Sequence, residues 1–162
     1  MTEKQITAKI AFCALDELSE GEKSLIQMAK KATSKAYAPY SGFQVGAAVL
    51  LDNGEILSGN NQENAAYSSG LCAERVVLFY ANARFPESKV LTLAIAAQNM
   101  IGFSNAPISP CGSCRQVLLE IENRYHSKIR ILLYGEDEIA IVDSIRDLLP
   151  MSFDGSSLAI AD

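Results

Sequence analysis

Clustered basic residues are the first feature that this sequence lacks. Lysine and arginine together number 14 against 19 aspartates and glutamates, which gives a net charge of −5 and an isoelectric point near 4.9. Proteins that bind DNA or RNA neutralise phosphates with grouped lysine and arginine side chains. We therefore expect no nucleic-acid polymer as a partner, and a small polar ligand fits the composition better.

Long apolar runs and domain linkers are also missing. The N-terminal stretch MTEKQITAKIAFCAL carries charges early, and its apolar part is too short for a membrane span or a signal peptide. No repeat or low-complexity tract divides the chain. We expect a single domain over residues 1–162, with residues 1–19 as an N-terminal arm, in a cytoplasmic protein that does not enter a membrane.

Histidine and cysteine are scarce, which narrows the possible metal sites. The single histidine, His126, lies at the polar end of a predicted helix and away from every motif, so we interpret it as a surface residue. Among the four cysteines, Cys111 and Cys114 form a C-x-x-C pair, Cys72 stands in LCAER, and Cys13 lies in the arm. In a reducing compartment, four cysteines indicate metal binding or catalysis before disulfides.

The predicted elements alternate between helix and strand. Apolar spacing predicts helices over 20–36, 71–83 and 114–125, strands over 90–98, 128–135 and 139–143, and a short helix over 144–149. Asn53-Gly54, between two apolar runs, predicts a β-hairpin with a type I′ turn. Alternating strands and helices favour an α/β layer structure. The hairpin makes the five-stranded sheet mixed.

Two of the predicted helices begin at a cysteine. Cys72 opens the helix after the second strand, and Cys111 opens the helix after the third. Ligands of α/β proteins gather at the carboxyl ends of strands. If the two strands are parallel neighbours, both helix starts face one crevice, where the helix dipoles favour thiolate over thiol. Three sulfurs from two helix starts could then bind one metal ion.

The C-x-x-C pair admits three readings: a redox couple, part of a metal site, or a coincidence. A redox couple is typical of thioredoxin-like folds, but this chain lacks the opening β-α-β pattern of that fold. A structural zinc site usually takes four protein ligands, and only three cysteines are grouped here. Three ligands and one open position for water are typical of a catalytic zinc ion.

A catalytic zinc ion needs a proton acceptor beside its water, and Glu74 follows Cys72 by two residues. A glutamate in the first turn of a helix is often a solvated partner of the helix dipole. The neighbours in LCAERVVL are mostly apolar, however, and a carboxylate in such surroundings is rare without a task. C-A-E followed by P-C-x-x-C is the known signature of zinc deaminases, with cysteine in place of the first histidine.

Four stretches extend this signature: YAPYSGFQVGAAV, GNNQENAAY, GLCAER and PCGSCRQVLLE. In order and spacing they resemble cytidine deaminases of the small, homotetrameric, three-cysteine type, over about residues 20–153. The resemblance implies a three-layer α/β/α sandwich, Zn²⁺ held by Cys72, Cys111 and Cys114, and Glu74 as the proton shuttle. The longer arm and NNQENAAYSSG, where CNVENASYGLG is commoner, depart from the pattern.

The resemblance also implies the substrate contacts. Asn61 and Glu63 match residues that hold the ribose hydroxyls, and Phe43 matches an aromatic residue that lines the base pocket. The backbone of Ala73 matches a contact to the pyrimidine carbonyl. Phe153 matches a phenylalanine that reaches a neighbouring subunit's site, which implies a homotetramer with composite active sites.

Two more residues are expected outside the metal ligands themselves. Arg75 resembles an arginine that offsets the charge of the thiolates by hydrogen bonding. We expect Gln116 to lie, like Arg75, next to the metal ligands. An ordinary surface arginine is the alternative for Arg75.

The expected activity is hydrolytic deamination of cytidine and deoxycytidine to uridine and deoxyuridine, a pyrimidine-salvage reaction. One alternative is a deaminase of a modified cytosine nucleoside or nucleoside antibiotic. Another is a non-catalytic zinc-binding module, against which Glu74 argues because a scaffold has no use for a carboxylate beside the metal. Asn61 and Glu63 argue against free cytosine, since ribose contacts would be idle.

Overall fold

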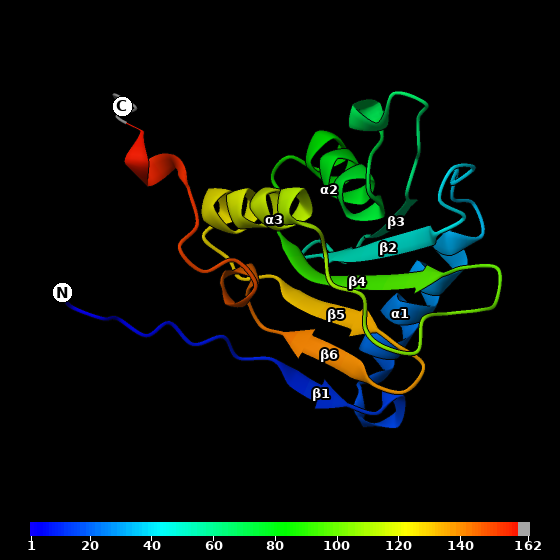
Figure 1. The fold of residues 1–162 in the computed structure, drawn as a ribbon, viewed down its shortest axis with the longest axis horizontal. Helices are drawn as coiled ribbons and strands as arrows, with labels where there is room; N and C mark the ends of the chain where they lie inside the picture. The colour runs from blue at the N-terminus through cyan, green and yellow to red at the C-terminus, as the bar shows by residue number, and fades with distance from the viewer. Residues whose placement is uncertain (159–162) are drawn as a thin grey trace.

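A mixed β-sheet with helices on both faces organises the chain in the computed structural model, which describes residues 1–158 (Figure 1). The sheet order is β1-β6-β5-β4-β2-β3. The strands are β1 (Ala11–Cys13), β2 (Gln44–Leu51), β3 (Ile56–Asn60), β4 (Val90–Gln98), β5 (Arg130–Tyr134) and β6 (Ile139–Val142). The α-helices are α1 (Glu20–Thr33), α2 (Ala73–Arg84) and α3 (Gly112–Tyr125). Single 3₁₀ turns are η1 (Leu15–Glu17), η2 (Tyr67–Ser69), η3 (Ile145–Asp147) and η4 (Gly155–Ser157).

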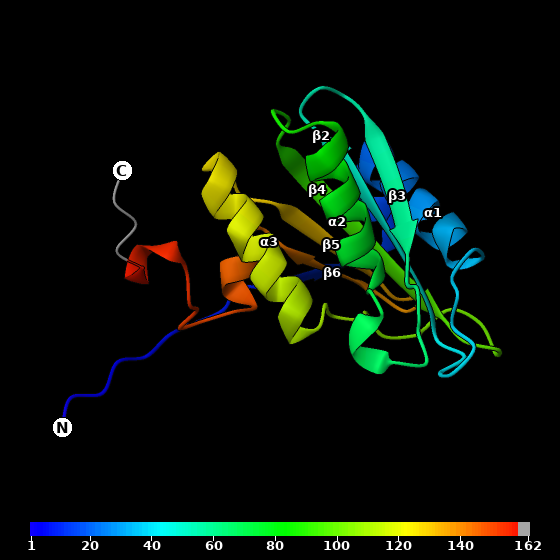
Figure 2. The ribbon, with the colours of Figure 1, turned by 90° about the horizontal axis from the view of Figure 1, so that it is seen from above.

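The helices form two outer layers around the sheet. Helices α2 and α3 cover one face and α1 covers the other, as Figure 2 shows. Side chains alternate accordingly along β2: Val49 packs in the cluster with α2 and α3, while Ala48 packs in the cluster with α1. The predicted three-layer α/β/α architecture is therefore confirmed. Within residues 1–158, no helix is both long and apolar enough to cross a membrane.

Within residues 1–158 the sheet has six strands, and the prediction of five was wrong. The additional strand, β1, comes from the N-terminal arm and pairs antiparallel with β6, with Ala11 opposite Ile141 and Cys13 opposite Ile139. Three residues are too few to show the alternating pattern by which a strand is recognised in a sequence. The pairing depends instead on backbone hydrogen bonds to a strand more than a hundred residues away.

The hairpin between β2 and β3 is present, but its turn differs from the predicted type I′. Gly54 has a φ of 85°, and Asn53 is not among the described non-glycine residues with positive φ. The amide of Leu51 donates to the carbonyl of Glu55, at 2.9 Å, so the loop has three residues. A three-residue hairpin loop combines a type I turn with a left-handed residue, which only Gly54 supplies here.

The two cysteine-led helices meet although their strands are not neighbours. Strand β2 lies between β3 and β4 and is antiparallel to both, so the condition of adjacent parallel strands was wrong. Helices α2 and α3 nevertheless lie side by side on one face (Figures 1 and 2). A Cβ atom at Gly59 would lie 2.9 Å from the amide nitrogen of Val77, so the glycine lets α2 pack closely on β3.

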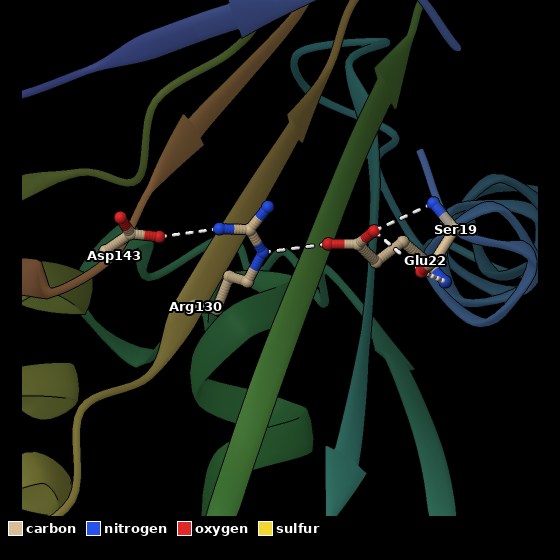
Figure 3. Close-up of polar contacts among 4 residues, drawn as sticks. All are labelled: Ser19, Glu22, Arg130 and Asp143. Carbon is tan, nitrogen blue, oxygen red and sulfur yellow. Dashed lines mark hydrogen bonds and ion pairs between the residues drawn. The ribbon is translucent and has the colours of Figure 1, made fainter. Parts of the chain in front are cut away.

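Helix α1 is fixed to the sheet by a chain of polar contacts at its N-terminus (Figure 3). Ser19 caps the helix in a capping box with Glu22, as the sequence SEGE favours. Glu22 also accepts from Nε of Arg130 at 2.8 Å, and Nη1 of Arg130 contacts Asp143 at 2.6 Å. These partly exposed ion pairs each contribute about 0–1 kcal/mol. The first pair holds the first turn of α1 against β5, and the second ties β5 to the residue that follows β6.

Candidate metal centre

Three cysteine sulfurs converge where α2 and α3 begin. Cys72 is the N-cap residue of α2, Cys111 is the N-cap residue of α3, and Cys114 lies in the first turn of α3. The Sγ atom of Cys111 lies 3.8 Å from Sγ of Cys72 and 3.5 Å from Sγ of Cys114, and all three sulfurs lie within 4.8 Å of one another. A disulfide would bring two sulfurs to about 2.05 Å. Tetrahedral zinc with Zn–S bonds of about 2.3 Å spaces neighbouring sulfurs by about 3.8 Å, so the donor set fits a zinc ion.

The electrostatics of the cluster favour a thiolate at Cys72 and a protonated thiol at Cys114. Hydrogen bonding from Cys114, with a contribution from Arg75, lowers the pKa of the Cys72 thiol to about 5 although burial opposes the shift. Hydrogen bonding to Cys72 and burial raise the pKa of Cys114, so the cluster shares protons unequally. A divalent cation among the sulfurs displaces such protons, because a coordinating thiol is deprotonated.

Glu74 is a buried carboxyl group beside the sulfurs. Its side chain lies in the first turn of α2, and the residue is 4% exposed. Burial raises the pKa of Glu74, and the negative charge of Cys72 raises it further. The alternative of a solvated dipole partner is therefore wrong. A carboxyl group with a raised pKa is suited to accept and return protons near neutral pH.

Arg75 lies against the metal centre rather than on an open surface. Its Nη2 is 4.0 Å from Sγ of Cys72 and donates to the carbonyl of Gly70 at 3.4 Å. Its Nε is buried and has no hydrogen-bond partner among the described residues. The guanidinium therefore brings a positive charge to the thiolate that begins α2.

A cavity of about 480 Å³ opens next to Cys72. Its lining comprises Tyr40, Ser41, Asn61, Gln62, Glu63, Asn64, Tyr67, Gly70, Leu71, Cys72 and Arg75. The volume is in the range of small-molecule sites, about 300–1,000 Å³. The tyrosines at 40 and 67 were not predicted, and they pack edge to face with ring centroids 5.8 Å apart. The only sequence signal for them is their position inside the motifs YAPYSG and NAAY.

Asn61 and Glu63, the residues predicted to hold the ribose hydroxyls, line this cavity, and both also hold the local backbone. Asn61 accepts from the amide of Val45 at 2.8 Å and donates to the carbonyl of Phe43 at 2.9 Å. Glu63 accepts from the Ser41 hydroxyl and from the backbone amides of Ser41 and Tyr40. Hydrogen bonding, first from the Ser41 side chain, lowers the pKa of Glu63. A carboxylate has about four acceptor sites, so one stays available to a ligand.

The other predicted contacts lie outside the lining of this cavity. Phe43 is half-buried, and Ala73 is completely buried behind Cys72 in the first turn of α2. Phe153 is 60% exposed, and its carbonyl accepts from Nε2 of Gln116 at 2.9 Å. Gln116 therefore supports the C-terminal segment instead of contacting a sulfur. The predicted surface residue His126 is exposed and ends α3 in a left-handed conformation.

The geometry agrees with a comparison to known protein families. Residues 19–127, two thirds of the chain, match the sequence model of the family described as "Cytidine and deoxycytidylate deaminase zinc-binding region". The chain belongs to this deaminase family. The match includes all three clustered cysteines and Glu74, whereas Cys13 lies outside it.

Individual members of the deaminase family are similar over most of the chain. A cytidine deaminase of Sporosarcina psychrophila is 40% identical over 139 residues, which cover 86% of this chain and 96% of that protein. A cytidine deaminase of Mycobacterium tuberculosis is 36% identical over 130 residues, which cover 77% and 84%. The crystal structure of a cytidine deaminase from Burkholderia pseudomallei has a TM-score of 0.69 at 36% identity and covers 84% of this chain and 100% of that one. The zinc-binding region that the family model describes, together with the three converging sulfurs, makes zinc the metal of the cysteine cluster.

Proposed function

We propose that this chain hydrolyses cytidine and deoxycytidine to uridine and deoxyuridine, with release of ammonia. The observation that carries the proposal is a buried carboxyl group, Glu74, next to a three-cysteine zinc site whose Cys72 lines a cavity of about 480 Å³. The names of the similar proteins, all cytidine deaminases, support the substrate class.

Glu74 performs the proton transfers of this reaction. Zinc held by the three cysteines supplies a Lewis acid that lowers the pKa of water toward about 7. Glu74 accepts a proton from the water that adds to C4 of the pyrimidine ring, and it delivers this proton to N3. It then transfers a second proton from the added oxygen to the amine, which leaves as ammonia. The raised pKa of the carboxyl group suits both directions of transfer.

Two polar side chains of the cavity select a nucleoside. Glu63 has one acceptor site left after its three hydrogen bonds, and Asn61 lines the same cavity. We assign both to the ribose hydroxyls. Phe43, directly before β2, and the backbone of Ala73, at the start of α2, are assigned to the base by their match to the family motifs.

Arg75 adjusts the charge of the metal site. Three thiolates carry one more negative charge than Zn²⁺ carries positive charge, and this excess weakens the Lewis acid. The guanidinium 4.0 Å from Sγ of Cys72 offsets part of that charge.

The active assembly is proposed to be a homotetramer with composite sites. Phe153 exposes 60% of its surface, and Phe79 and Tyr80 on the outer side of α2 expose 46% and 53%. Large apolar side chains in these positions are typical of surfaces that another subunit covers. Glu74→Gln chains mixed with Phe153→Ala chains, after dissociation and reassociation, should regain activity that neither has alone. A fully active monomer would contradict this assembly.

The activity itself is tested with purified protein on cytidine, deoxycytidine and cytosine, followed by absorbance. We expect turnover of both nucleosides and little of free cytosine, because cytosine cannot use Asn61 and Glu63. Turnover of a modified cytosine nucleoside alone would identify that nucleoside as the substrate. Zinc binding without any turnover would indicate a non-catalytic module.

The four described cysteines form no disulfide, which fits the reducing cytoplasm in which we place the protein.

A further inference from the structure

Arg115, the residue directly after Cys114, makes three hydrogen bonds that the activity described above does not use. Its Nε donates to the carbonyl of Pro110 at 2.8 Å, and its Nη2 donates to the hydroxyl of Ser109 at 3.0 Å. Its Nη1 donates to the carbonyl of Leu148 at 2.7 Å. The side chain is half-buried. Its contacts show that it reaches back from the first turn of α3 over the loop that precedes the helix.

These hydrogen bonds support Cys111, which is the least buried of the three sulfur donors. Cys114 is completely buried and Cys72 is half-buried, whereas Cys111 is exposed. Packing therefore holds Cys114 in place but does little for Cys111. The Pro110 carbonyl, to which Nε of Arg115 donates, belongs to the peptide group that joins Pro110 to Cys111. Fixing this peptide plane fixes the direction in which the Cys111 side chain leaves the backbone.

Only an arginine can make this set of contacts. The three acceptors lie in the directions of three different guanidinium nitrogens, and the planar group holds these directions relative to one another. A lysine at this position has a single nitrogen and cannot reach all three acceptors at once. Lysine would keep the positive charge while losing the fixed geometry, which makes it the informative replacement.

The same group connects the metal site to the C-terminal segment. Leu148 follows η3, and the next residue of α3, Gln116, donates to the carbonyl of Phe153 in the same segment. Two consecutive side chains of α3 thus tie this segment to the helix that supplies two of the three sulfurs.

We propose that Arg115 is a positioning residue that holds the exposed zinc ligand Cys111 in coordinating geometry by fixing the loop Ser109–Pro110 against the Leu148 carbonyl. The inference rests on the three-cysteine zinc site of the proposed function. It does not depend on the substrate, and its test uses the metal rather than turnover.

The test compares Arg115→Lys with Arg124→Lys as a matched control. Arg124 lies in the last turn of the same helix, where it donates to the carbonyl of Pro86. Zinc release to a chromophoric chelator should be about 10–100-fold faster in Arg115→Lys and unchanged in Arg124→Lys. Cobalt-substituted Arg115→Lys should show altered sulfur-to-cobalt absorption bands, because one thiolate is held less firmly. Parental release rates together with parental cobalt bands would overturn the proposal.

A second variant keeps the proposal testable if Arg115→Lys does not fold. Ser109→Ala removes one acceptor and leaves the other two hydrogen bonds possible. Zinc release from Ser109→Ala should be a few-fold faster, and a rate equal to that of the parent would overturn the proposal. If the assay on nucleosides fails while these rates change as expected, the substrate assignment is wrong and the role of Arg115 stands.

Discussion

The starts of α2 and α3 have much in common, yet they differ in what they bring to the site. Each helix begins at a cysteine whose side chain makes no capping hydrogen bond, and each follows a strand of the same sheet. The first turn of α2 holds the buried acid Glu74 and the cation Arg75. The first turn of α3 holds no acidic residue, and it supplies a second sulfur through Cys114 instead.

In the proposed mechanism, this difference separates metal coordination from proton transfer. Helix α3 provides two of three metal ligands and is fastened by Arg115 to the loop before it. Helix α2 provides one sulfur together with Glu74, the group to which we assign the proton transfers. Damage at the start of α3 should therefore remove the metal, while damage at Glu74 should leave the metal and stop the reaction.

The largest expected effect follows the loss of a ligand. Cys111→Ala should have no measurable deaminase activity, because two thiolates from this site do not hold a catalytic zinc ion. Cys13→Ala serves as the control and should match the parent, since Cys13 pairs in β1 and lies outside the sulfur cluster. Activity of Cys111→Ala within tenfold of the parent would show that Cys111 is not a ligand.

Replacement of the acid ranks next. Glu74→Gln should lower kcat by ~10²–10⁴-fold, because an amide cannot accept the proton. General acid–base catalysis contributes a rate factor of about this size. The measurement is the steady-state rate on cytidine at neutral pH. A rate within tenfold of the parent would assign the proton transfers to a different residue.

The charge beside Cys72 should have a smaller effect. Arg75→Gln removes the guanidinium near the thiolate, and we expect a loss of about 10–100-fold in kcat. Arg124→Gln on α3 is the control for removing a positive charge. Equal kcat values for Arg75→Gln and the parent would mean that the thiolate charge needs no offset.

The smallest expected effect concerns the ribose. Glu63→Gln should raise KM for cytidine by roughly tenfold, because a carboxylate binds a hydroxyl more strongly than an amide does. Residual reaction with cytosine should change less. Glu63 also accepts three hydrogen bonds from residues 40–41. Equal losses on nucleoside and free base would therefore assign Glu63 to holding that loop.

Features encoded by short local patterns were predictable from the sequence. Cys72, Glu74 and the C-x-x-C pair lie where the deaminase signature places them, and the residues 90–98 predicted as a strand form β4. Helix ends and strand centres are fixed by spacing, punctuation and apolar pattern, which a sequence shows directly. The approach of Cys72 to Cys111 was expected for a reason that the sheet order does not bear out, because β2 separates the two strands.

Features that depend on distant partners were not predictable. β1 exists because three arm residues pair with β6, and the hairpin turn follows the pairing of Leu51 with Glu55 rather than the Asn53-Gly54 pair alone. Arg115 reaches acceptors 5 and 33 residues away, and only the folded chain brings these together. Long-range contacts of this kind leave no periodic trace in a sequence.

The zinc content of purified Glu74→Gln tests the division between the two helix starts most directly. We predict one zinc ion per chain by elemental analysis, as in the parent, in a protein whose turnover is at least a hundredfold lower, the conservative end of the acid–base range. Cys111→Ala, measured beside it, should retain almost no zinc. Loss of zinc from Glu74→Gln, or a full complement of zinc in Cys111→Ala, would contradict the account.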